Sequence, residues 1–100
     1  MASHELPAIV NFDNLPELRS AGEAYIDGID APVFDLARLT VASSAVVALM
    51  VAWFRYAHAH GKVVSFVNVP EGVMNIVEVS ELTELLPIEA SATAHIGGAA

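Results

Sequence analysis

Residues 33–61 read VFDLARLTVASSAVVALMVAWFRYAHAHG, and this stretch decides the fold. It opens with a short apolar segment after Pro32, which is typical of a strand buried on both faces. Residues 43–60 contain neither glycine nor proline, and Gly61 supplies the signal that ends a helix. The stretch therefore predicts a buried strand followed by a helix of about eighteen residues.

The flanking segments repeat this alternation of strand and helix. Residues 8–12 and 62–69 are short and apolar, as strands are, and helices are predicted from near Leu15 to Gly28 and from Pro70 to about Leu82. Helical links between the strands favour an α/β domain, with a mostly parallel sheet of about four strands and three helices packed against it. The predicted organisation is an N-terminal extension (1–7), one domain (8–88) and a flexible tail (89–100).

Composition excludes several classes of partner and site. Twelve acidic residues face four basic ones, so the net charge of −8 opposes binding to nucleic acid and to anionic lipid headgroups. A basic surface on another protein is the expected electrostatic complement. The absence of cysteine removes disulfides and thiolate metal sites. No secretory signal is recognisable, and the uncharged run 39–54 is too short to cross a bilayer, so a cytoplasmic location is expected.

The sequence lacks the motifs of catalysis and cofactor binding. Its glycines do not form a phosphate-binding loop, so no nucleotide cofactor is expected. Ser44 and His58 lie on one predicted helix about 21 Å apart, too far to share a proton. His58 and His60 point to different sides of that helix, which argues against a metal site. Asp35 and Arg38 are interpreted as an orienting charge pair at a strand end, and no catalytic residue is assigned.

The long helix is apolar on two sides. One side carries Val47, Met50, Val51, Phe54 and Ala57, the expected core stripe. The other carries Ala45, Leu49, Trp53 and Tyr56. A helix with two apolar sides is either sandwiched within its own domain or partly reserved for a partner. We favour a partner surface, and the alternative is that another helix of the same chain covers Trp53.

Three stretches together resemble a known family. The opening stretch, extended to Lys62, resembles the middle of a STAS domain, the fold of anti-sigma-factor antagonists and of the MlaB subunit of bacterial phospholipid transporters. FVNVPEGVMNIVEVSEL resembles the last strand and third helix of that family, and NFDNLPEL resembles the start of the first helix in MlaB-type chains. The resemblance covers residues 8–88 and implies a STAS-like fold.

The residues at the start of the long helix depart from the family pattern. Placed without gaps, Ser43 stands where the family has an acidic residue, and Ser44 stands at its Ser/Thr position. Ala45 then occupies the position at which antagonists carry the phosphorylated serine, and Val46 replaces a glycine. A shift of one residue would instead place Ser44 at the phosphorylation site.

The resemblance implies a non-enzymatic accessory subunit that binds the ATPase of a lipid-transporting ABC complex and lies at the inner membrane through that partner. The alternative is a partner-switching regulator controlled by phosphorylation of Ser44 or Ser43. Neither function requires a cofactor or membrane insertion, and a homodimer is left open. The predicted partner-binding residues are Ser43, Ser44, Ala45, Val46, Leu49 and Trp53.

Overall fold

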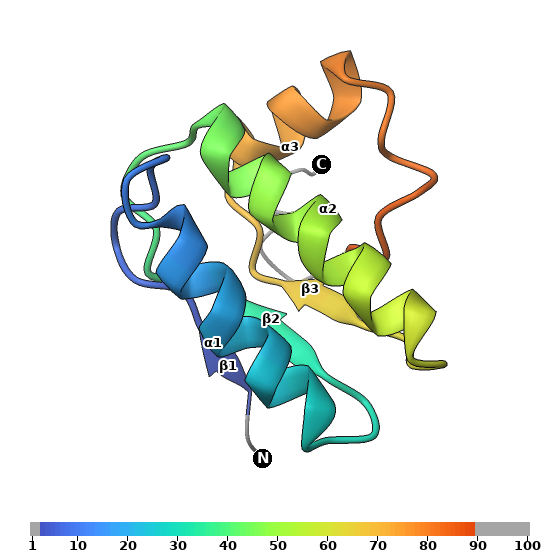
Figure 1. Ribbon diagram of the computed structural model, residues 1–100. Helices are drawn as coiled ribbons and strands as arrows, with labels where there is room; N and C mark the ends of the chain where they lie inside the picture. The colour runs from blue at the N-terminus through green and yellow to red at the C-terminus, as the bar shows by residue number, and fades with distance from the viewer. Residues whose placement is uncertain (1–2, 90–100) are drawn as a thin grey trace.

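Strands and helices alternate along the chain in a computed structural model that describes residues 3–89 (Figure 1). The elements are β1 (His4–Glu5), α1 (Leu15–Asp27), β2 (Val33–Asp35), α2 (Ser44–Ala59), β3 (Ser65–Val67) and α3 (Glu71–Val79). All three predicted helices are therefore confirmed, and α1 begins at the expected Leu15. The predicted flexible tail lies, from residue 90 onward, outside the described residues.

The three strands of the described chain form one parallel sheet in the order β1-β2-β3. Phe34 of β2 lies opposite Phe66 of β3, and Glu5 of β1 lies opposite Asp35. A parallel bridge between Phe66 and Ile88 extends the sheet beyond β3. This arrangement confirms the predicted α/β class, with a sheet slightly smaller than the expected four strands.

One face of the sheet is more completely buried than the other. Phe34 and Phe66 are fully buried, whereas their neighbours along both strands are only half-buried, because successive side chains point to opposite faces. The prediction that β2 is buried on both faces is therefore wrong. In Figure 1, α2 lies between α1 and α3, and it contacts both helices. The central helix thus has neighbours from its own chain on two sides.

Trp53 of α2 occupies the centre of the core. Its indole stacks on the Phe34 ring with centroids 4.0 Å apart, and its Nε1 donates a hydrogen bond to the Arg19 carbonyl oxygen of α1 at 3.2 Å. Gly22 of α1 lies directly against the same ring, so that even a methyl group at this position would collide with it. The close approach of α1 explains why Trp53 is completely buried.

The first strand is not where the sequence predicts it. Residues 8–12 form a loop, and the strand beside β2 lies at residues 4–5, in the segment predicted to be an extension. The loop closes on itself because the Asn11 side chain accepts hydrogen bonds from the backbone N–H groups of Asp13 and Asn14, both at 2.9 Å. Asn14 Oδ1 accepts from the Asn11 backbone in return. These bonds compete with pairing in a sheet.

Two polar contacts join the end of α1 to later parts of the chain. The Lys62 ammonium donates to the carbonyl oxygens of Ile26 and Asp27 at 2.6 and 3.1 Å, where the helix dipole is negative. The Tyr56 hydroxyl donates to the Asp27 carboxylate at 2.8 Å. This hydrogen bond, followed by burial and the negative charge of Asp27, raises the pKa of Tyr56.

Stability should depend on the protonation of His4. The His4 imidazole packs against Tyr25, Phe34 and Trp53, with ring centroids 5.1, 5.4 and 6.1 Å away, and burial lowers its pKa from 6.5. The contribution of His4 to the free energy of unfolding is therefore fully present above about pH 6.5. It is lost as the pH falls below that value, because the unfolded chain binds the proton more tightly. Urea denaturation at about pH 7.5 and 5.5 should show this loss. A His4→Phe variant should show a smaller loss, and an unchanged loss would contradict the prediction.

Candidate functional site

Two loops meet at the start of α2 and form the candidate site. The backbone N–H and the hydroxyl of Thr40 both donate to the Ala8 carbonyl oxygen, at 2.9 and 3.1 Å. Ser43 Oγ donates to the Val10 carbonyl oxygen at 3.2 Å. Three hydrogen bonds between segments more than thirty positions apart therefore hold residues 8–10 against residues 40–43. In Figure 1 the blue and green loops lie together at this end of the molecule.

The two serines at this end have different environments. Ser43 is the N-cap residue of α2, but its hydroxyl makes no capping hydrogen bond because it is bound to Val10. Ser44, the first residue of the helix, is exposed. Its hydroxyl therefore lies at the positive end of the helix dipole, where an anionic group is favoured. Of the two serines, Ser44 is the one available to a partner or a modifying enzyme.

The loop between β2 and α2 is held by Asp35. Its Oδ1 accepts hydrogen bonds from the Ala37 backbone N–H at 2.9 Å and from Asn68 Nδ2 at 3.0 Å. Asn68 has a φ of 55°, a left-handed conformation that asparagine tolerates. Arg38 does not pair with Asp35 as predicted, since its guanidinium lies 3.6 Å from the Glu5 carboxylate. Asp35 therefore orients the loop through hydrogen bonds, and Arg38 forms a separate, exposed ion pair.

Four of the six predicted partner-binding side chains do not form an exposed surface. Trp53, Leu49 and Val46 are fully buried, and Ala45 is 1 % exposed. The assignment of these four residues to an open docking face is wrong, because all four belong to the hydrophobic core, in which Trp53 packs between Phe34 of the sheet and Gly22 of α1. The exposed residues near the helix start are Ser44 and, one turn later, Ala48.

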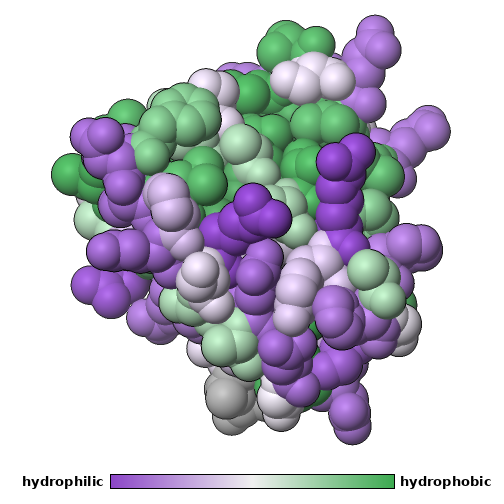
Figure 2. All heavy atoms as spheres, in the orientation of Figure 1, coloured by the Kyte–Doolittle hydropathy of each residue, from purple (hydrophilic) through white to green (hydrophobic). Residues whose placement is uncertain are grey.

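Three large apolar side chains near this end were missed as site residues. Ile9, Phe12 and Val41 are 54, 65 and 56 % exposed, on the two loops that the hydrogen bonds join. Figure 2 shows the face of the molecule that is seen in Figure 1. Hydrophobic residues gather over the half of this face where α2 begins and α3 lies, and hydrophilic residues cover the opposite half. Asn11 and Asn14, on either side of Phe12, could have indicated this exposure from the sequence. Asparagine favours turns, and a turn at the surface leaves its apolar side chains exposed.

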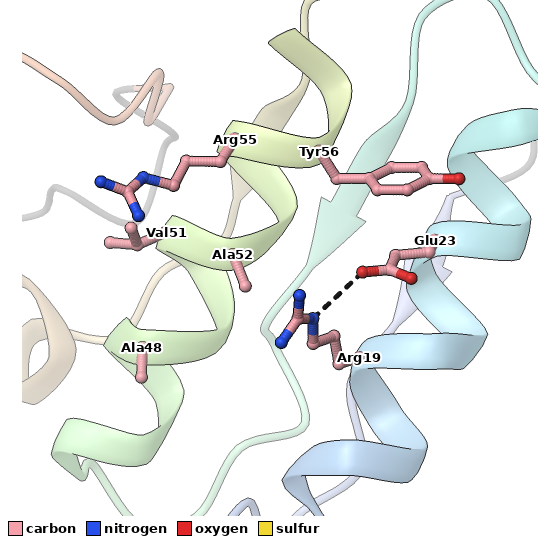
Figure 3. A pocket seen from close by; sticks show the side chains of 7 residues that line it. All are labelled: Arg19, Glu23, Ala48, Val51, Ala52, Arg55 and Tyr56. Atoms are coloured by element: carbon pink, nitrogen blue, oxygen red, sulfur yellow. Dashed lines mark hydrogen bonds and ion pairs between the residues drawn. The ribbon is translucent and has the colours of Figure 1, made fainter. Parts of the chain in front are cut away.

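A groove separate from the candidate site lies between α1 and α2 (Figure 3). This open groove has a volume of about 390 Å³. Arg19 extends from α1 toward α2 and pairs with Glu23 at 3.0 Å, whereas Arg55 points away from α1. The two guanidinium groups do not converge, so the groove does not form a site for one small anion. The residues that line it are Arg19, Glu23, Ala48, Val51, Ala52, Arg55 and Tyr56.

Residues 3–89 contain no cluster of three or more His, Asp or Glu side chains that could hold a metal ion. His58 and His60, considered above as ligands, are both exposed near the end of α2, and the His60 ring nitrogen Nδ1 lies 2.8 Å from the Tyr56 carbonyl oxygen. No helix in this part of the chain is long and apolar enough to span a bilayer.

Solved structures share this architecture at low sequence identity. The anti-sigma factor antagonist SpoIIAA in its unphosphorylated form is 16 % identical, with a TM-score of 0.67 over 90 % of this chain and 80 % of that one. An anti-sigma factor antagonist from Thermotoga maritima is 14 % identical, with a TM-score of 0.70 over 94 % of this chain and 79 % of that one. A STAS domain protein from Planctomyces limnophilus is 17 % identical, with a TM-score of 0.68 over 90 % of this chain and 83 % of that one. These likenesses show the fold.

No curated protein matches the chain. The family model described as the Mlab STAS domain matches residues 5–87, from β1 to the segment that joins the edge of the sheet. The match covers strands β2 and β3, the second residue of β1, the three helices and both loops at the start of α2. The chain therefore belongs to the MlaB-like family of STAS domains.

Proposed function

We propose that this protein is a non-enzymatic accessory subunit that binds the ATPase of a lipid-transporting ABC complex through the start of α2. The observation that carries the proposal is the exposed, small-residue end of that helix, formed by Ser44 and Ala48 and flanked by loops held in one arrangement. Small side chains let a partner approach the helix closely, and ordered loops lower the entropic cost of binding.

Family membership and charge support this function. The family model is that of an MlaB-type STAS domain, and the resemblance to MlaB, a subunit of bacterial phospholipid transporters, implies that the chain acts through contact with a partner protein. The net charge of −8 favours a basic partner surface and disfavours direct contact with anionic lipid. The protein would thus be cytoplasmic and would reach the inner membrane through the ATPase.

Ala48→Arg should weaken binding to the ATPase by about 100-fold. The new side chain would occupy the space that a closely packed partner needs, and its charge would repel a basic surface. The affinity of the purified chain for the ABC ATPase of the same organism is the measurement. Ala59→Arg is the matched control, because Ala59 is exposed on the same helix at its far end. Equal affinity of both variants and the native chain would contradict the docking assignment.

Ser44 supports a second candidate function, regulation by phosphorylation. It is exposed at a helix N-terminus, where a phosphate would be stabilised, whereas the hydroxyl of Ser43 is bound to Val10. Intact-mass measurement of the chain purified from its own host tests this alternative. A phosphate on Ser44, together with capture of an ATP-dependent serine kinase instead of a transporter, would favour signalling over transport.

A further inference from the structure

The most exposed aromatic side chain of the described residues lies beside the start of α2. Phe12 is 65 % exposed, and two more apolar side chains are more than half exposed: Ile9 on the same loop, and Val41 on the loop that is hydrogen-bonded to it. The three residues form what we call the apolar anchor. An apolar cluster of this kind on an otherwise acidic protein is typical of an interaction site, because leaving it in water costs free energy that burial in a partner would recover.

The anchor is held in a defined shape. Phe12 lies inside the turn formed by Asn11 and Asn14, whose side chains make three hydrogen bonds to backbone N–H groups within residues 11–14. Asn14 Nδ2 also donates to the Ile9 carbonyl oxygen at 2.9 Å. The loop that carries Val41 is bound to the loop that carries Ile9 through Thr40 and Ala8. Rigid presentation of aromatic and aliphatic side chains is characteristic of binding hot spots.

Three carboxylates lie on the segments next to the anchor, and none of them is neutralised by an ion pair within residues 3–89. Asp13 follows Phe12, Glu17 lies in the first turn of α1, and Glu71 lies in the first turn of α3, next to the Gly72 that packs on Ala42. All three are exposed. Their charges repel anionic membranes and a second copy of this acidic chain.

We propose that the apolar anchor of Ile9, Phe12 and Val41 inserts into an apolar pocket of the partner protein whose rim carries lysine or arginine. The inference rests on the proposed function, since it assumes a protein partner at the start of α2. It adds the chemistry of that partner: Phe12 fills the pocket, and the carboxylates on the neighbouring segments pair with the basic rim.

Site-specific photo-crosslinking in the native host tests the proposal. Phe12 is replaced by p-benzoylphenylalanine, and Val63 and Val79 are replaced in separate controls because they are 77 and 81 % exposed outside the anchor. Position 12 should crosslink to apolar residues of one protein, flanked in its structure by Lys or Arg, and the two controls should not. A crosslink from position 12 to a second copy of this chain, or to a site without basic residues, overturns the proposal, as does no crosslink at all.

Affinity for the crosslinked protein, once purified, gives a quantitative test. Phe12→Ser should weaken it by about 100-fold and Val41→Ser by at least tenfold, whereas Val63→Ser and Val79→Ser should change it less than about twofold. Melting temperatures should stay unchanged, because all four side chains are exposed. Equal losses at the four positions would contradict the anchor. The identity of the crosslinked protein tests the proposed function separately, since a protein other than an ABC ATPase would remove that function and leave the anchor.

Discussion

Replacing Gly22 with alanine is expected to lower the free energy of unfolding by about 3 kcal/mol, and the melting temperature by roughly 15 °C. The added Cβ would overlap Cε2 and Nε1 of the Trp53 indole and lie 2.5 Å from Cζ2. The ring cannot easily move away, because it stacks on Phe34 on one face and its Nε1 is bound to the Arg19 carbonyl oxygen. The strain would therefore displace α1 from α2.

A second glycine on the same helix provides the control. Gly28 follows the last residue of α1 and has a φ of −98°, and a Cβ there would approach nothing closer than 3.9 Å. Gly28→Ala should therefore change the free energy of unfolding by less than about 0.5 kcal/mol. Thermal and urea denaturation, followed by circular dichroism, measure both variants. Equal stability of the two would show that α1 does not lie against Trp53.

A double-mutant cycle would test whether the stability lost in Gly22→Ala comes from a clash with the Trp53 indole. In a Trp53→Leu background the smaller side chain leaves room for a methyl group at position 22, so Gly22→Ala should cost much less there than in the native chain. An identical cost in both backgrounds would place the strain elsewhere in α1. The cycle thus separates a clash with Trp53 from a general effect on the helix.

Most boundaries of the helices were predictable because they depend on local signals, but α3 ends at Val79 and not at the predicted Leu82. Pro16 and Glu17 fit the first turn of α1, and Gly61 follows the end of α2, where its φ of 72° needs a glycine. The strand β1 was not predictable, since two residues cannot show alternation of apolar and polar side chains. The apolar residues 8–12 were mistaken for that strand because periodicity alone does not reveal hydrogen bonds between asparagine side chains and backbone.

The candidate site was predicted in part. The start of α2 is exposed at Ser44, as docking there requires, but periodicity could not decide which structure covers the second apolar side of the helix. The decisive signal was Gly22, a glycine inside α1 that disfavours the helix and therefore indicates close packing. The role of Phe12 depends on contacts between loops far apart in the sequence, which no local pattern contains.

Leu49→Asp is expected to unfold the domain at 25 °C, whereas Ala48→Asp, one position earlier, should leave it folded. Leu49 is fully buried, so the variant both loses apolar contacts and places a carboxylate where it cannot be solvated. The combined cost of several kcal/mol is comparable to the whole stability of a small domain, about 5–15 kcal/mol. Ala48 is exposed, and the cost of its replacement is limited to a weaker helix propensity, about 0.5 kcal/mol.

Far-ultraviolet circular dichroism and thermal denaturation of the two variants distinguish the two interpretations of α2. If the second apolar side of the helix were a docking face, Leu49→Asp would keep a native spectrum and melting temperature and would only lose its partner. Burial of Leu49 in the core predicts instead that the spectrum of Leu49→Asp is that of an unfolded chain, while Ala48→Asp melts cooperatively near the native temperature. Loss of binding by Leu49→Asp would then reflect loss of the fold, and only substitutions at exposed positions such as Ala48 and Phe12 can report on docking.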